Sequence, residues 1–218
     1  IHIQNPKTQF NSFDLIICPE HDNLNKQNSI STLLALHNIE FTKNIRKKGE
    51  INFILGGPNK YFKFDNFTQQ NICDEIIILS KNNFINIIPS RRTPNNFIKR
   101  LKNLDIKNTS LIEDQFNPIE YGNLLSTSDA HIVTWDSISM ISEAISSGAK
   151  TLIFPFEEKN CPQRYKEFYK KIYNQGLAQN YNRDLKAPIA DLTKYNLDLR
   201  SMILNKIESH LWFKSDAS

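Results

Sequence analysis

The sequence predicts an α/β fold in which a parallel sheet is covered by helices on both faces. From residue 50 onward, short apolar segments alternate with segments of helical periodicity, and the apolar segments lack the polar alternation of a half-exposed sheet. Strands buried on both faces read as continuous apolar runs, which is typical of parallel sheets. Residues that favour turns follow most of these runs, where strand-to-helix loops are expected.

The elements of this sheet follow one another along the chain. The expected strands lie at 51–55, 84–88, 110–113, 130–135 and 151–154. The expected helices lie at 67–80, 95–104, 118–126, 138–147, 164–175 and 198–211. Thr93 can cap the second of these helices, and Pro94 suits its first position. Gly148 suits the end of the helix at 138–147.

The first 45 residues have a different pattern and predict a remnant of an N-terminal domain. Strands are expected at 1–4 and 13–18, and 29–36 forms a short strand or a turn of helix. So few elements cannot close a core by themselves. The chain opens with Ile1 inside a β pattern, so we expect it to derive from a longer parent.

A basic segment at 43–49 separates the two patterns and predicts an interdomain linker. It lacks apolar periodicity, which favours a solvated loop over a phosphate-binding patch. The expected domains are therefore 1–45 and 46–218, the second with a helix returning at its C-terminus.

Composition narrows the class of protein. Three cysteines in 218 residues form neither a CxxC pair nor an even set, which excludes a disulfide scaffold and a zinc ribbon and favours a reducing, cytoplasmic compartment. We expect no metal site. No apolar run is long enough for a membrane span. The net charge of +4, from 27 basic and 23 acidic residues, gives no sign of a nucleic-acid partner. A peripheral contact with a membrane surface stays open.

The loops that stand out follow strands, so they fall on the carboxyl edge of the sheet, where open α/β sheets bind ligands. The candidate binding residues on this edge are Gly56, Gly57, Ser90, Arg91, Arg92, Thr93, Asp136, Ser137, Ser139, Met140 and Glu143. The alternative is that these are ordinary turn residues, since every strand-to-helix junction needs them.

Each group suggests a particular chemistry. Guanidinium groups match phosphate oxygens, so Arg91 and Arg92 could clamp a diphosphate. Alternatively one of the two pairs with a carboxylate such as Glu113 or Glu143, and we expect one arginine to take each role. Gly56 and Gly57 could let the backbone approach a phosphate closely.

The helix at 138–147 adds a second kind of contact. Free backbone N–H groups at 137–139 form a site for an anion, and Glu143, about one turn in, could accept hydrogen bonds from sugar hydroxyls. The alternative is an ordinary capped helix with a solvated face.

Glu20, His21 and Asp22 combine groups suited to acid–base chemistry and are the weak candidates for catalysis. Their spacing matches no metal site of known strength. A polar loop after a strand is the favoured explanation of these residues.

Taken together, the chain resembles the family of the plant elongated-mitochondria fission protein and its bacterial relatives. The matching segments are IQNP at 3–6, FDLIICPEHD at 13–22, ILGGPNK at 54–60, PSRRTP at 89–94 and NPIEYGNLLSTSDAHIVTWDSISMISEA at 117–144. The family's NPY appears here as Asn-Pro-Ile at 117–119. Its TxGALH segment appears at 32–37 with Leu34 in place of Gly.

This resemblance implies a fold similar to the two-domain GT-B glycosyltransferases, whose second, Rossmann-like domain holds a nucleotide diphosphate-sugar. In that scheme the arginine pair and the helix start at 137–139 hold the diphosphate, and Glu143 takes the ribose. The acceptor lies near 20–22, and neither a cofactor nor a metal is needed. The plant member is implied to be a non-catalytic adaptor that brings a dynamin-related protein to mitochondria. The expected function is thus nucleotide-sugar binding, with glycosyl transfer open; the alternatives are such an adaptor and an α/β fragment without function.

Overall fold

The structure is a computed structural model that describes residues 1–42, 45–112 and 117–215. Contacts along the chain divide it into two compact units. The first unit comprises Ile1–Leu36 together with Asp191–Ser218, and the second comprises His37–Ala190.

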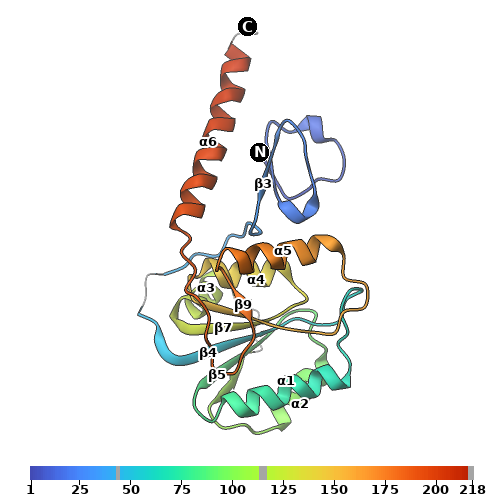
Figure 1. Cartoon of the computed structure of the whole chain (residues 1–218), viewed down its shortest axis with the longest axis vertical. Helices are drawn as coiled ribbons and strands as arrows, with labels where there is room; N and C mark the ends of the chain where they lie inside the picture. The colour runs from blue at the N-terminus through green and yellow to red at the C-terminus, as the bar shows by residue number, and fades with distance from the viewer. Residues whose placement is uncertain (43–44, 113–116, 216–218) are drawn as a thin grey trace. The chain divides into compact units, whose positions relative to one another are not determined.

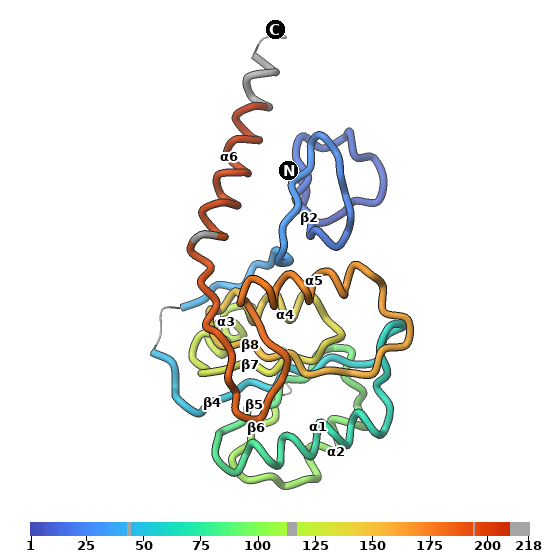
Figure 2. Tube along the Cα trace, viewed as in Figure 1, coloured from blue at the N-terminus to red at the C-terminus, as the bar shows by residue number. Residues whose placement is uncertain are grey.

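The second unit is built on a parallel sheet, which confirms the predicted α/β class (Figure 1). In the described part of the chain its strands follow the order β6-β5-β4-β7-β8-β9, and all neighbours are parallel. Their bounds are β4 (Lys47–Leu55), β5 (Phe84–Pro89), β6 (Thr109–Leu111), β7 (Ser128–Thr134), β8 (Lys150–Phe154) and β9 (Gln179–Asn180). Figure 2 traces the chain from β4 outward through β5 and β6 and then back to β7. The strand order therefore reverses between β4 and β7.

Helices cover both faces of this sheet, as Figure 1 shows. They are α1 (Asn66–Leu79) and α2 (Asn95–Asn103) on one face, and α3 (Pro118–Thr127), α4 (Ile138–Ser146) and α5 (Gln163–Asn174) on the other. Ile72 and Ile76 of α1 and Phe97 of α2 are buried with Phe53 of β4 in one apolar core. Burial of this periodic apolar stripe positions the helices on the sheet.

A buried polar row crosses the other face of the sheet. Asn86, Asn52, His131 and Thr151 are neighbours in register on β5, β4, β7 and β8. Asn86 Nδ2 donates to Asn52 Oδ1 at 3.0 Å, and Asn52 Nδ2 lies 3.3 Å from His131 Nδ1. The other ring nitrogen of His131 lies 2.9 Å from Ser147 Oγ. Burial lowers the pKa of His131 to about 3, so the ring is neutral.

The described part of the basic segment, residues 45–49, is not the solvated linker that the sequence predicts, and residues 43–44 lie outside the described residues. β4 already begins at Lys47, and the guanidinium of Arg46 is directed into the second unit. It donates to the carbonyl oxygens of Ser128 at 2.9 Å and Ser147 at 2.7 Å. Arg46 thereby satisfies carbonyls just beyond α3 and at the end of α4, a role that needs a cation at this position.

The boundary expected at 45/46 likewise lies inside the second unit. Residues before it already pack on α3: a Cβ added to Gly122 would lie 2.1 Å from the carbonyl oxygen of Glu40. The backbone N–H of Thr42 donates to Ser126 Oγ at 3.0 Å. This close approach, which requires glycine, ties the chain to the second unit from His37 onward.

The first unit holds a smaller parallel sheet, of order β1-β2-β3 in the described residues. Its strands are β1 (His2–Ile3), β2 (Ile16–Pro19) and β3 (Ser29–Thr32), with 3-10 turns η1 (Phe10–Ser12) and η2 (Glu20–Asp22). The helix α6 (Thr193–Ser215) packs on it, with Leu199, Ile203 and Ile207 against Leu15, Ile17 and Ile30. None of the helices in the described residues is long and apolar enough to cross a membrane.

Candidate functional site

Three of the predicted edge residues, Gly56, Gly57 and Arg92, meet at a fourth, Asp136, in the loop between β7 and α4. The Asp136 side chain is fully buried, with 0% exposure. Thr134 Oγ1 donates to its Oδ1 at 2.7 Å, and the backbone N–H of Gly57 donates to its Oδ2 at 3.2 Å. Arg92 Nη2 completes the network with an ion pair of 2.6 Å to Oδ2. One carboxylate thus joins the loops after β4, β5 and β7 at the point where the strand order reverses.

Gly56 and Gly57 are required by packing within the chain. A Cβ on Gly56 would lie 2.1 Å from the carboxylate of Asp136, and one on Gly57 would lie 2.0 Å from the carbonyl oxygen of Arg92. The Gly57 N–H is already donated to Asp136. The close approach that the sequence suggested for a phosphate is therefore made by the chain's own loops.

Thr93 has a different role from the helix cap that the sequence suggested. The helix α2 begins at Asn95 with Pro94 as its N-cap residue. Thr93 Oγ1 instead donates to the carbonyl oxygen of Gly56 at 2.6 Å and accepts from the backbone N–H of Ser90 at 2.9 Å. Ser90 and Thr93 therefore hold the β5–α2 loop against the end of β4.

The two neighbouring arginines have different surroundings, as expected, but the carboxylate that pairs with one of them is not one of those expected. Arg92 pairs with Asp136, rather than with Glu143; Glu113 lies outside the described residues. Arg91 is exposed and forms no ion pair with any residue that the structure describes. Arg91 is therefore the arginine of the pair that remains available to a ligand.

The start of α4 lies at the same edge of the sheet. Ser137 is the N-cap residue, as its position predicts, and its Oγ accepts from the backbone N–H of Met140 at 3.5 Å. Ser139 is exposed and Met140 is half-buried, while Ile138 and Ile141 face the core. The N-terminal end of the helix dipole thus points to the edge where Arg91 lies.

Glu143 lies one turn further along α4 and is half-buried. Its Oε2 accepts from Tyr121 Oη of α3 at 3.4 Å. Burial raises the pKa of Glu143 to about 7, and the bond from Tyr121 acts in the opposite direction. Near neutral pH this group therefore exists both as a carboxylate, which accepts from hydroxyls, and as an acid, which donates.

Two cation–tyrosine pairs at this edge escaped the sequence analysis. Lys60 and Tyr61 follow the glycines after β4, and Arg164 and Tyr165 lie at the start of α5. Arg164 Nη2 donates to Tyr61 Oη at 3.3 Å. The signal in the sequence was a cation directly before a tyrosine, once in the loop after β4 and once at the start of the helix that follows β8.

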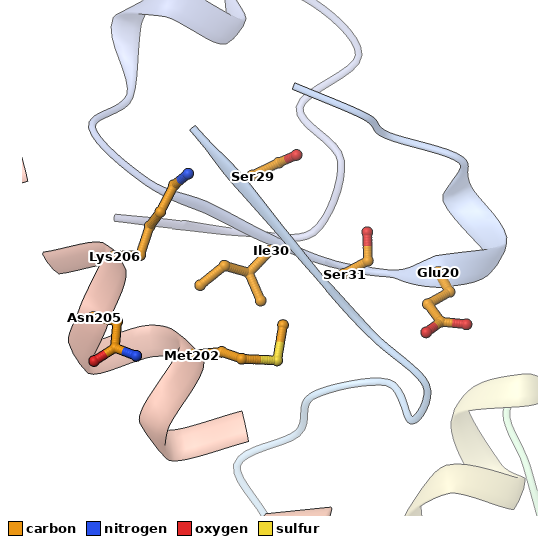
Figure 3. A pocket seen from close by; sticks show the side chains of 7 residues that line it. All are labelled: Glu20, Ser29, Ile30, Ser31, Met202, Asn205 and Lys206. Carbon is orange, nitrogen blue, oxygen red and sulfur yellow. The ribbon is translucent and has the colours of Figure 1, made fainter. Parts of the chain in front are cut away.

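The weak catalytic candidates Glu20, His21 and Asp22 form the turn η2 of the first unit. Glu20 lines an open groove of about 610 Å³, whereas His21 and Asp22 do not (Figure 3). Its lining residues are Glu20, Ser29, Ile30, Ser31, Met202, Asn205 and Lys206. No cluster of metal-binding side chains occurs among the described residues.

A model of the family described as "Mitochondrial fission ELM1" matches residues 1–202. The chain belongs to this ELM1 family. A curated relative, the Mitochondrial fission protein ELM1 of Arabidopsis thaliana, is 23% identical over 219 residues, which covers 83% of this chain and 51% of the relative. The chain spans about half the length of that ELM1 relative.

Three solved structures are similar to the ELM1-family chain. The glycotransferase of kitacinnamycin has a TM-score of 0.44 at 11% identity, over 82% of this chain and 44% of its own. The spinosyn forosaminyltransferase SpnP has a TM-score of 0.45 at 13% identity, over 78% of this chain and 42% of its own. The MurG protein of Acinetobacter baumannii has a TM-score of 0.44 at 13% identity, over 88% of this chain and 52% of its own.

Proposed function

We propose that the second unit binds a nucleoside diphosphate, or its sugar ester, at the carboxyl edge of its sheet. The observation that carries this proposal is the Asp136 network, which brings the loops after β4, β5 and β7 together where the strand order reverses. In open α/β sheets this is the position at which ligands bind.

The residues divide the work according to their surroundings. Arg91 and the N-terminal end of α4 at 137–139 would bind the diphosphate. Arg92 is held by Asp136 and acts as a positioning residue. Glu143, with its pKa near 7, would bind the ribose hydroxyls, donating or accepting as required.

Transfer of a sugar would break the bond between its anomeric carbon and the diphosphate oxygen and form a bond to an acceptor hydroxyl. The negative charge left on the diphosphate would be stabilised by Arg91 and the helix dipole, without a metal or a cofactor.

Calorimetric titration of the intact chain with UDP-, GDP-, TDP- and CDP-sugars tests the proposal. For the ligand that wild type binds, Arg91→Gln should weaken affinity about tenfold to a hundredfold, since a charge-assisted hydrogen bond contributes about 1.5–3 kcal/mol. Arg100→Gln, on α2, is the matched control and should leave affinity unchanged. Equal affinities in Arg91→Gln and Arg100→Gln would exclude Arg91 as a ligand contact.

The second candidate is the adaptor that the resemblance to the fission family implies, which would recruit a dynamin-related protein. The observation in its favour is that α6 exposes Leu197, Met202 and Leu204. If these side chains contact a partner, Leu197→Ser with Leu204→Ser should abolish capture of a purified dynamin-related GTPase. Wild-type chain that does not bind this GTPase would remove the support for the adaptor.

For either function, the expected compartment is the cytoplasm. The support is that Cys18, Cys73 and Cys161 are free thiols, which suits a reducing compartment. Fluorescence microscopy of the tagged chain in its native cell tests this placement.

A further inference from the structure

Two cations and two tyrosines form an arrangement at the carboxyl edge that the Asp136 network does not use. Lys60 Nζ lies 4.9 Å from the ring centroid of Tyr61, and Arg164 Nη2 donates to Tyr61 Oη at 3.3 Å. The guanidinium carbon of Arg164 lies 5.9 Å from the ring centroid of Tyr165. The two tyrosine rings pack with centroids 5.3 Å apart. Both cations therefore converge on the hydroxyl of Tyr61.

Backbone pairing between two loops fixes this arrangement. The N–H of Lys63 donates to the carbonyl of Glu157, and the N–H of Lys159 donates to the carbonyl of Tyr61, both at 2.8 Å. Phe62 is fully buried beneath them. The loops after β4 and β8 are thus joined to each other, and Tyr61 is held in place on a packed aromatic base.

The positive charge at this point is not balanced. Neither Lys60 nor Arg164 forms an ion pair with a carboxylate of the described residues, and Arg164 Nε is buried without an acceptor among them. Two ion pairs take up the carboxylates of the neighbouring loop, Lys63 with Glu157 and Lys166 with Glu158. A hydrogen bond from Lys60 and the charge of Arg164 lower the pKa of Tyr61, as expected for a hydroxyl beside unbalanced positive charge.

The arrangement adjoins the site proposed for the diphosphate. Asn59 joins the two places, because its Nδ2 donates to the carbonyl oxygen of Asp136 at 3.2 Å and its Oδ1 accepts from the backbone N–H of Tyr61 at 2.8 Å. Tyr61 Oη accepts from Arg164, which leaves its own proton to be donated.

We infer that Lys60, Tyr61 and Arg164 form an oxyanion subsite that binds a phosphate group of the ligand. The ammonium and guanidinium groups donate charge-assisted hydrogen bonds to its oxygens, and Tyr61 donates a third. This inference rests on the proposed function in one respect, that ligand phosphates bind at this edge. The phosphate is either the distal group of the nucleoside diphosphate or a group carried by the second substrate.

Calorimetric titration of the intact chain at one pH and ionic strength tests the subsite, with inorganic pyrophosphate, UDP and glucose 1-phosphate as probes. Lys60→Gln should weaken the affinity for pyrophosphate about tenfold, and Tyr61→Phe should weaken it less. Lys63→Gln is the matched control, because it removes the same charge from the same loop but from a lysine already paired with Glu157. It should change affinity less than about twofold.

The probes identify the source of the phosphate. Loss of UDP and pyrophosphate affinity in Lys60→Gln assigns the subsite to the diphosphate, and loss of glucose 1-phosphate affinity alone assigns it to the second substrate. Equal affinities in Lys60→Gln and Lys63→Gln for all three probes, or no pyrophosphate binding by wild type, would overturn the inference. If Lys60→Gln and Lys63→Gln bind all three probes equally but Arg91→Gln still weakens UDP binding, the proposed function stands without the subsite. If only Lys60→Gln weakens binding, the subsite stands and the role of Arg91 falls.

Discussion

Acidification should destabilise the protein through His131. Its pKa is about 3 in the folded chain and about 6.5 when unfolded. Because the folded pKa lies below the unfolded one, the unfolded chain takes up the proton first. The contribution of the neutral ring is complete above about pH 6.5 and is lost as the pH falls toward 3. At about 1.4 kcal/mol for each unit of pKa, the loss is about 3 kcal/mol by pH 4.

Urea unfolding between pH 7 and pH 4 measures this loss. The variant His131→Gln keeps a donor and an acceptor for Asn52 and Ser147 but does not titrate. Its free energy of unfolding should be lower than that of wild type at pH 7. Between pH 4 and 6, its slope against pH should correspond to the uptake of almost one proton fewer on unfolding. Carboxylates titrate in both proteins, so the difference isolates His131. Equal pH slopes of the unfolding free energy in wild type and His131→Gln would refute the reasoning. So would a His131 imidazole resonance that titrates near pH 6 in the folded protein.

Three further outcomes can be measured by urea unfolding. Gly57→Ala should cost about 3 kcal/mol or more, because the new Cβ meets the backbone carbonyl of Arg92; a cost near zero would show that the loops yield. Arg92→Gln should cost about 3 kcal/mol, because the buried carboxylate of Asp136 loses its ion pair. Adding Asp136→Asn should recover about 1 kcal/mol, and strictly additive costs would contradict the pairing. Glu143→Gln should gain stability relative to wild type as the pH rises from 5 to 8. The folded pKa of Glu143 is raised to about 7, so the protonated carboxyl's contribution to stability is lost as the pH rises through this range. A stability difference between the two proteins that does not depend on pH would contradict this.

Local patterns predicted the elements well, because a buried strand or a capped helix is determined by residues close together in the sequence. The strand at 51–55 is the apolar part of β4, and the Ser137 cap begins α4 as expected. Thr93 shows the limit of such signals. A threonine before a proline has the pattern of a cap, but its hydroxyl bonds to the end of β4 instead.

Long-range partners could not be predicted in this way. In a basic run, Arg46 has the same sequence pattern as a solvated lysine, since the carbonyls that it binds lie some 80 to 100 residues away. The sequence allowed Glu113 or Glu143 as the partner of an arginine, but the partner is Asp136, whose burial no periodicity indicates. The convergence of the candidate residues on one sheet edge was predictable, because parallel topology alone determines it.

Because Asp136 is bonded to the loops after β4, β5 and β7, these loops are already ordered in the folded protein. Ordering a loop costs about 1–2 kcal/mol for each residue that is fixed, and here that entropy is lost on folding rather than on binding. A ligand at this edge therefore meets a preorganised surface. Such a surface selects by shape and charge, and a ligand whose phosphates do not match the fixed positions of its donors gains nothing from induced fit.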